Sequence, residues 1–285
     1  MSAIRAEVSQ ELTVRRPWNL CEPVEDREKV QVRVHGTEEK QTLVYLPGVH
    51  GDWTLVGGFR RALADRLRFV EISYPLGVHW TISGYAVAIV RELANRGITS
   101  GWLVAESFGS QVAWEISRQS GFRVEGIILA GGFVRHPVPL LADLACAMCG
   151  NGSFRILRAA LAVYSQVARF RFERSPEMLA EIREFVARRT ETDFHSGRHR
   201  LALISRHDPR KNVMKLCIPV FALSGFFDPV VPWRSVRRWL ERNCIGFREH
   251  ILIWPADHNV LGTAPKAAAD QVLSWIFTQP KPDHR

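Results

Sequence analysis

One serine lies where its hydroxyl could be activated as a nucleophile. Ser107 belongs to the run AESFG at 105–109, which follows the apolar stretch WLV at 102–104 and precedes a helix-like segment. A serine at a tight turn between a strand and a helix is exposed above the sheet, close to backbone N–H donors and open to a histidine. Because a serine hydroxyl attacks esters poorly by itself, this chemistry also needs a histidine as base and an acid that orients the histidine.

An aspartate and a histidine follow the serine, in the order Ser, Asp, His that an architecture with this strand-to-helix serine turn requires. Asp228 lies in LSGFFDPVVP and His258 in WPADHNVLG, each three residues beyond an apolar run that ends at Gly225 or Pro255. Residues just past the carboxyl ends of parallel strands gather at one rim of the sheet. We therefore expect both side chains to lie near Ser107.

Ordinary structural roles also explain these residues when each is taken alone. Asp228 is typical of a turn that caps a helix beginning near Val231, and the run 257–259 is typical of a loop or of the cap of the last helix. The joint occurrence of the residues, in order and at strand ends, favours catalysis. Glu106, beside the serine, is interpreted as a solvated or structural neighbour and has no part in the mechanism.

Two backbone N–H groups are candidates to stabilise the oxyanion that forms when the serine attacks. Phe108 supplies one N–H, and the loop after the apolar run TLVYLPG at 42–48 supplies the second. In that loop the turn at Pro47 and Gly48 points to Val49 as the second donor, with His50 as a nearby alternative. A Pro-Gly pair is also an ordinary turn signal.

Short β-like runs alternate with longer helix-like segments through most of the chain. This alternation predicts an α/β fold with a mostly parallel central sheet flanked by helices. Strands are expected at 30–36, 42–48, 69–75, 101–107, 124–132, 218–225 and 250–255, and helices at 53–66, 82–95, 108–120, 231–243 and 265–277. The alternation stops between 135 and 212, where the sequence is helix-like. The expected organisation is an N-terminal extension at 1–29, an α/β core at 30–134 and 213–285, and a helical, arginine-rich cap at 135–212.

The serine turn and the two strand ends resemble those of an α/β-hydrolase with an inserted cap. The resemblance spans about residues 30–278 and is carried best outside 135–212. It implies that Ser107 is the nucleophile, His258 the base and Asp228 the orienting acid, with the oxyanion donors at Val49 and Phe108.

Two positions depart from the pattern of these enzymes. Ala105 stands for the first glycine of G-x-S-x-G, and Pro47 stands where many of the enzymes have a histidine. Neither change removes a reactive group, since the alanine adds only one methyl. The expected activity is hydrolysis of a carboxylic ester or thioester through an acyl-enzyme, with no metal or organic cofactor. Acyl transfer, hydrolytic carbon–carbon cleavage and a catalytically silent ligand-binding module stay open as alternatives.

Positive charge is concentrated in the expected cap. The chain has a net charge of +9 and a pI near 9.7. Within 135–212, fourteen basic residues, all but Lys211 arginine, stand against eight acidic ones. Guanidinium groups suit phosphate and carboxylate. Because related carrier-linked hydrolases use basic caps, the resemblance implies an acyl carrier protein or a coenzyme A thioester as a candidate partner.

Two other interpretations of these arginines stay open. They can form solvated helix faces paired with nearby acids, namely Glu173, Glu177, Glu181 and Glu184. Nucleic-acid binding is disfavoured because no recognised binding motif accompanies the charge. Apolar residues of the segment can line an acyl pocket or, as we favour, pack between helices: Leu140, Leu141, Leu144, Phe154, Ile156, Leu157, Leu161 and Val163.

Other patterns carry little functional signal. Asp193, His195 and His199, with His207 and Asp208 beyond, have some metal-ligand spacing, but no second motif completes a set. A lone C-x-x-C at 146–149 is interpreted as two buried thiols, and five scattered cysteines do not resemble a disulfide framework. The first 20 residues do not resemble a signal peptide, and no run reaches the roughly 18 to 20 apolar residues of a membrane span. We therefore expect a cytoplasmic enzyme.

Overall fold

Apolar side chains alternate between the two faces of the central strands, and this alternation determines where the helices pack. In β4 (Ser100–Glu106), Leu103 and Ala105 face one hydrophobic core, whereas Trp102 and Val104 face the other. Strands that bury both faces are typical of a parallel sheet covered by helices on both sides. The computed structural model describes residues 27–137, 154–171, 173 and 175–279.

The central sheet has seven strands in the order β1-β3-β2-β4-β5-β6-β7. Strand β1 is antiparallel to β3, and the other neighbours are parallel. The expected α/β architecture with a mostly parallel sheet is therefore confirmed. The remaining strands are β1 (Gln31–His35), β2 (Thr42–Leu46), β3 (Arg68–Ser73), β5 (Arg123–Ala130), β6 (Val220–Gly225) and β7 (Phe247–Ile253).

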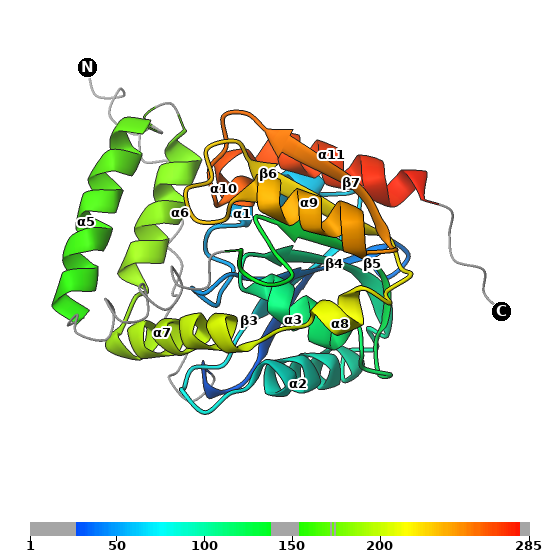
Figure 1. Cartoon of the computed structure of the whole chain (residues 1–285). Helices are drawn as coiled ribbons and strands as arrows, with labels where there is room; N and C mark the ends of the chain where they lie inside the picture. Colours follow the sequence, from blue (N-terminus) through cyan, green and yellow to red (C-terminus); the bar gives the residue numbers. More distant parts are fainter. Residues whose placement is uncertain (1–26, 138–153, 172, 174, 280–285) are drawn as a thin grey trace, which may run out of the picture.

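Helices cover both faces of the sheet (Figure 1). One face packs against α2 (Ile82–Ala94), α3 (Gly109–Ile116) and α9 (Trp233–Asn243). The other face packs against α1 (Gly57–Leu63), α10 (Val260–Thr263) and α11 (Pro265–Thr278). Nearly all of the buried apolar side chains belong to these two cores, so the loops at the carboxyl ends of the strands stand on a rigid support.

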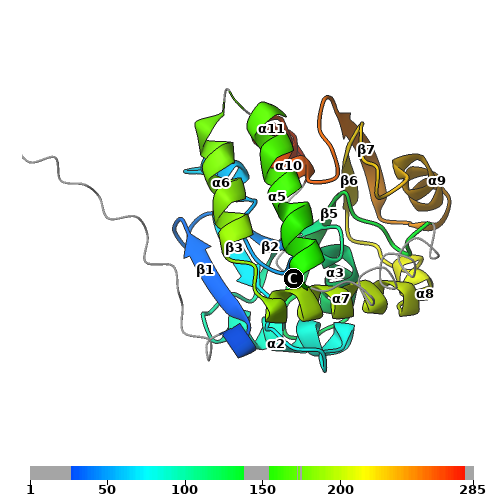
Figure 2. The ribbon, with the colours of Figure 1, turned by 90° about the vertical axis from the view of Figure 1, so that its left-hand side faces the viewer.

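Among the described residues, four helices lie between β5 and β6 in the sequence: α5 (Phe154–Arg171), α6 (Pro176–Ala187), α7 (Glu191–Arg206) and α8 (Arg210–Val213). Figures 1 and 2 show α5 as the outermost helix, with α6 beside it. Met178 and Ile182 of α6 form a small apolar cluster with Leu55. These helices fall in the segment that was expected to be a cap.

Two helices begin later than the apolar pattern predicts. The expected helix at 53–66 begins only at Gly57, because the N–H and the hydroxyl of Thr54 both donate to the Asp52 carboxylate in a turn before α1. The helix expected at 231–243 begins at Trp233, directly after Pro232, whose fixed φ suits a helix start. No helix among the described residues is long and apolar enough to span a membrane.

Candidate active site

The backbone at Ser107 adopts the turn that its sequence position predicts. Strand β4 ends at Glu106, Ser107 has a φ of +47°, and α3 begins at Gly109. The Ser107 N–H donates to Ala130 O (3.1 Å), and the Ser110 hydroxyl donates to Ser107 O (2.6 Å). A positive φ at a residue other than glycine is strained and is found chiefly where surrounding contacts hold it, often at functional sites.

Close packing of α3 against β2 explains the glycine that follows the turn. A Cβ at Gly109 would lie 2.3 Å from Leu46 O and 2.9 Å from Pro47 O. The start of α3 therefore touches the beginning of the loop that carries Val49. Ala105, which replaces a glycine of the usual motif, is fully buried in the core, so its methyl group is accommodated.

The structure brings Ser107, His258 and Asp228 together. His258 Nε2 lies 3.0 Å from Ser107 Oγ, and His258 Nδ1 lies 2.8 Å from Asp228 Oδ2. Because a carboxylate only accepts, the Nδ1–H donates to Asp228, which leaves Nε2 to accept the serine proton. Close backbone approach makes this arrangement possible: a Cβ at Gly131 would lie 2.8 Å from His258 O, and one at Gly225 would lie 2.1 Å from Asp257 O.

The environment of His258 favours its protonated form. Burial lowers the pKa of the imidazole, but the hydrogen bond and the negative charge of Asp228 outweigh burial and raise the pKa above its ordinary value. Glu106 and Asp257 raise it further through their charges. The side chain of Asp228 is only 1% exposed, so its interaction with the ring is weakly screened by water. An imidazole of this kind is a good acceptor for the serine proton.

The structural roles considered for these two loops are met only in part: α9 begins after Pro232 without a side-chain cap, and Asn259 caps α10, which is not the last helix. Asp228 Oδ1 accepts the N–H groups of Val230 (2.8 Å) and Val231 (2.9 Å), while Oδ2 contacts the histidine. Asn259 caps α10 through Gly262 N–H (3.0 Å). Asp228 therefore acts both as a turn residue and as the partner of His258, because each carboxylate oxygen has its own contacts.

Glu106 is more involved in the site than its sequence position indicates. Its side chain is buried and accepts a hydrogen bond of 2.5 Å from the Tyr45 hydroxyl. Burial and the charge of Glu106 raise the pKa of Tyr45 well above its ordinary value, so Tyr45 remains a donor. Glu106 is thus a buried carboxyl group beneath the serine turn. The sequence around Glu106 gives no pattern that would predict whether its carboxylate is buried or solvated.

Two arginines of the segment between β5 and β6 hold the loop that follows β2. Arg189 forms an ion pair with Asp52 and donates to His50 O (3.1 Å). Arg200 is fully buried and donates to Val49 O (2.9 Å) and Pro75 O (3.3 Å). Burial raises the pKa of Asp52, but the charges of Arg189 and His50 and the hydrogen bond from Thr54 act together to hold it well below its ordinary value. These arginines are structural contacts of the proposed oxyanion loop, which sequence composition alone did not indicate.

The glutamates of α6 pair with a different arginine from those considered in the sequence. Glu177 and Glu181 both contact Arg61 of α1, at 3.1 and 2.8 Å, whereas Glu184 contacts Arg188 (3.4 Å). The ion pairs therefore connect α6 to the core as well as stabilising the helix surface.

The residues with metal-ligand spacing have separate structural roles. Asp193 completes the capping box at the start of α7 and pairs with Arg27 (2.5 Å). His199 Nε2 lies 2.6 Å from Trp80 O, and His195 faces Glu191 at 3.9 Å. Within the described ranges no group of three or more His, Cys, Asp or Glu side chains is arranged to hold a metal ion. Cys146 and Cys149 lie outside the described residues.

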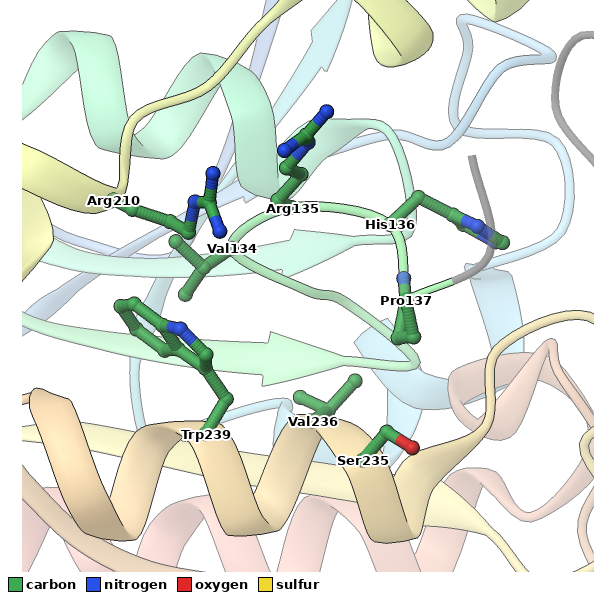
Figure 3. Close-up of a pocket in the computed structure, with 8 residues that line it drawn as sticks. All are labelled: Val134, Arg135, His136, Pro137, Arg210, Ser235, Val236 and Trp239. Carbon is green, nitrogen blue, oxygen red and sulfur yellow. The ribbon is translucent and has the colours of Figure 1, made fainter. Parts of the chain in front are cut away.

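A cavity of about 400 Å³ lies between the loop after β5, α8 and α9 (Figure 3). Arg135 and Arg210 lie on one side of it, and Trp239 and Ser235 of α9 lie on the other. The described residues that line it do not include the serine, the aspartate or the histidine. Of the residues considered for an acyl pocket, Val163 is exposed on α5. Leu140, Leu141 and Leu144 lie outside the described residues.

Comparisons with known proteins place this geometry among related folds. The model of the Alpha/beta hydrolase family matches residues 34–284. No curated protein matches the chain significantly. Similar solved structures include an enol-lactonase from Burkholderia xenovorans LB400, with a TM-score of 0.71 and 18% identity over 87% of this chain and 96% of that chain. A thermophilic esterase from Thermogutta terrifontis has a TM-score of 0.69 and 19% identity over 87% and 93% of the two chains.

Proposed function

Since the chain belongs to the alpha/beta hydrolase family, we propose that it is a serine hydrolase that cleaves a carboxylic ester or thioester through an acyl-enzyme on Ser107. The observation that carries this proposal is the hydrogen-bond chain from Ser107 Oγ through His258 to Asp228, with contacts of 3.0 and 2.8 Å. Esterases and lactonases among the similar folds are consistent with this reaction class.

Proton transfer in the first half-reaction follows from these contacts. His258 Nε2 takes the hydroxyl proton as Ser107 Oγ attacks the carbonyl carbon, and the imidazolium then gives that proton to the leaving alcohol or thiol. In the second half-reaction, His258 takes a proton from water as the water oxygen attacks the acyl carbonyl carbon. The imidazolium then returns that proton to Ser107 Oγ as the acyl–serine bond breaks and the carboxylic acid leaves. Asp228 stabilises the imidazolium in both half-reactions and is not itself protonated.

The oxyanion is assigned to the N–H groups of Phe108 and Val49. Phe108 is the first residue after the nucleophile, and the close contact of Gly109 with Leu46 and Pro47 supports the proximity of the two segments. Arg200 holds the Val49 carbonyl and so restrains the loop. Two such donors lower the energy of the tetrahedral intermediate, and loss of one such donor typically costs about 10²- to 10³-fold in rate.

Residues 135–212 are proposed to form a helical cap over this reaction centre. The buried contacts of Arg189 and Arg200 support the proposal, because they join this segment to the loop beside the serine. The same contacts occupy two of the arginines considered for an acyl carrier or a coenzyme A phosphate. The thioester partner is therefore kept as an alternative substrate form, and the cytoplasmic location stays a prediction.

The proposal is tested by serine labelling and turnover. Wild type is expected to react with a fluorophosphonate probe and to hydrolyse short p-nitrophenyl esters or acyl thioesters, whereas Ser107→Ala does neither. Ser235→Ala, which removes an exposed serine on α9, serves as the control and retains both properties. Labelling that persists in Ser107→Ala would contradict the assignment. Products formed with an added alcohol distinguish acyl transfer from hydrolysis, and binding without turnover identifies a silent module.

A further inference from the structure

Large aromatic side chains are exposed on the two loops that carry Asp228 and His258. Phe226 is 39% exposed, Phe227 52% and Trp254 65%, and Val230 beside them is 46% exposed. The Trp254 ring lies 4.6 Å from each phenylalanine ring, measured between centroids. We call these four residues the aromatic rim. Single exposed apolar residues are common on protein surfaces, whereas a contiguous exposed apolar patch is typical of an interaction site.

The backbone beneath the aromatic rim is well held. Phe226 N–H donates to Ile253 O, and Phe227 N–H donates to Ala256 O, both at 3.1 Å. These hydrogen bonds fasten the loop after β6 to the loop after β7. The rings are therefore presented outward by a rigid support, which limits the loss of conformational entropy when they insert into another phase.

Positive charge lies next to the aromatic rim. The Arg234 guanidinium is 4.8 Å from the ring centroid of Trp233, which in turn contacts Phe226. Helix α9 carries four arginines and one glutamate. The glutamate, Glu241, pairs with Arg237 (2.7 Å), and Arg234 and Arg238 are exposed. The surface thus combines apolar rings with a net positive helix.

A second exposed apolar surface lies on α5. On α5, Val163, Val167 and Phe170 follow the i, i+4, i+7 spacing of one helix face and are 64%, 58% and 85% exposed. Figures 1 and 2 both show the end of α5 that leads to α6 at the level of the loops after β6 and β7. Arg169 is exposed beside Phe170. The end of α5 and the loops after β6 and β7, which are far apart in the sequence, therefore lie at one end of the molecule.

We propose that this end of the molecule docks on an anionic lipid surface, with the aromatic rim inserted at the lipid–water boundary and the arginines of α9 against lipid phosphates. Tryptophan and phenylalanine are favourable at that boundary, and each cation near an anionic surface adds to the affinity. A second copy of the chain is a poorer occupant, because a net charge of +9 and an arginine-rich helix beside the aromatic rim oppose self-association.

Docking in this orientation defines a substrate class. The loops that insert are the loops that deliver Asp228 and His258, so an ester located in the lipid surface lies on the same side as the serine. The substrate is then an acyl ester of low water solubility that partitions into lipid. This substrate class rests on the proposed function, whereas docking itself does not need an active serine.

Docking is measured with the full chain carrying Ser107→Ala, so that lipid hydrolysis is excluded. The assay is co-sedimentation with phosphatidylcholine vesicles and with vesicles in which about a third of the lipid is phosphatidylglycerol. We expect binding to the anionic vesicles at least tenfold tighter than to phosphatidylcholine alone. Phe227→Gln with Trp254→Gln is expected to weaken binding to anionic vesicles about tenfold or more. Arg234→Gln with Arg238→Gln does the same and reduces the salt dependence.

Matched controls come from the amino ends of the strands, opposite the carboxyl ends that carry the aromatic rim. Ile245 is 68% exposed just before β7, and Arg91 is exposed in the last turn of α2. Ile245→Gln and Arg91→Gln remove similar groups and are expected to leave vesicle binding unchanged. Thermal unfolding of every variant checks that it is folded.

Three results would overturn the docking proposal. They are absence of binding to anionic vesicles, equal binding by the variant with both aromatic replacements, and a dimer in light scattering that this variant dissociates. With Ser107 present, the aromatic variant should keep its kcat/KM on a water-soluble short ester and lose at least tenfold on a long-chain ester in vesicles. If the protein binds anionic vesicles as expected but hydrolyses no ester, the proposed function is wrong and the docking proposal is retained.

Discussion

Removal of Arg189 provides a sharp test of how the helices between β5 and β6 are attached to the reaction centre. The side chains of Arg189 and Asp52 are 5% and 4% exposed, and their ion pair connects the end of α6 to the loop after β2. Arg189→Met keeps most of the side-chain volume but leaves Asp52 charged and buried. Breaking a buried pair in this way typically costs about 3–5 kcal/mol.

The structure places the expected cost near the lower end of that range. Asp52 keeps the hydrogen bonds from Thr54 N (3.1 Å) and Thr54 Oγ1 (2.5 Å), which continue to stabilise the carboxylate. We therefore expect Arg189→Met to lower the free energy of unfolding by about 3 kcal/mol at pH 7. Adding Asp52→Asn removes the uncompensated charge, so the double variant should recover at least half of the loss.

The pH dependence of the loss has a definite sign. In wild type the pKa of Asp52 is held below its ordinary value, so its stabilising contribution is present above the unfolded-state pKa, about 3.9, and is lost as pH falls through the folded value. Without Arg189, burial raises that pKa, and protonation relieves the buried charge. The difference between wild type and Arg189→Met should therefore be largest near neutral pH and shrink as the pH is lowered.

Urea unfolding followed by circular dichroism at pH 7 and pH 5 measures these free energies. Three outcomes would refute the reasoning: a loss below about 1 kcal/mol for Arg189→Met, no recovery in the double variant, or a loss that grows at low pH. Arg183→Met, on the surface of α6, controls for removal of an arginine as such and should change stability by less than about 0.5 kcal/mol.

Two further predictions concern the serine turn and its base. Asp228→Asn should lower kcat by about 10³- to 10⁴-fold. Activity requires neutral His258, and Asp228 raises the pKa of His258, so the acidic limb of the pH–rate profile on a p-nitrophenyl ester should move to lower pH in this variant. An acidic limb that does not shift would contradict this role of Asp228. Gly109→Ala should abolish fluorophosphonate labelling, because the new methyl group would lie 2.3 Å from Leu46 O. The control Ala105→Gly should retain labelling and lower the free energy of unfolding by about 1 kcal/mol. Equal labelling of both variants would contradict this explanation of the turn.

The fold and the three reactive side chains were predictable because both depend on local patterns. Apolar runs of strand length separated by helical segments predicted the sheet, and the family match and the sheet order confirm the fold. The positions of Ser107, Asp228 and His258 after strands predicted that they would lie near one another, as they do. Their catalytic roles stay predictions until activity is measured.

Contacts that depend on tertiary packing were not predictable from composition. Arg189 and Arg200 belong to a run of arginines that looks uniform in the sequence, yet these two are buried against the loop at Val49, whereas Arg169 faces solvent. The sequence leaves open whether Glu106 is solvated or structural, because its burial against Tyr45 depends on the packing of β2 beside β4. A charged residue in a sequence carries no local signal of burial, because its partner comes from a distant segment.

The attachment of α7 has a consequence for how a substrate reaches Ser107. Arg200 donates to two backbone carbonyls, Ser196 accepts Gly77 N–H (2.9 Å), and His199 contacts Trp80 O. Moving this helix away as a rigid body would break these hydrogen bonds together and leave the Arg200 guanidinium and the other polar groups without partners, each at a cost of about 1–3 kcal/mol. The equilibrium population of such a swung-out state is correspondingly small. Substrate access to Ser107 is therefore not expected to require displacement of α7 as a rigid unit.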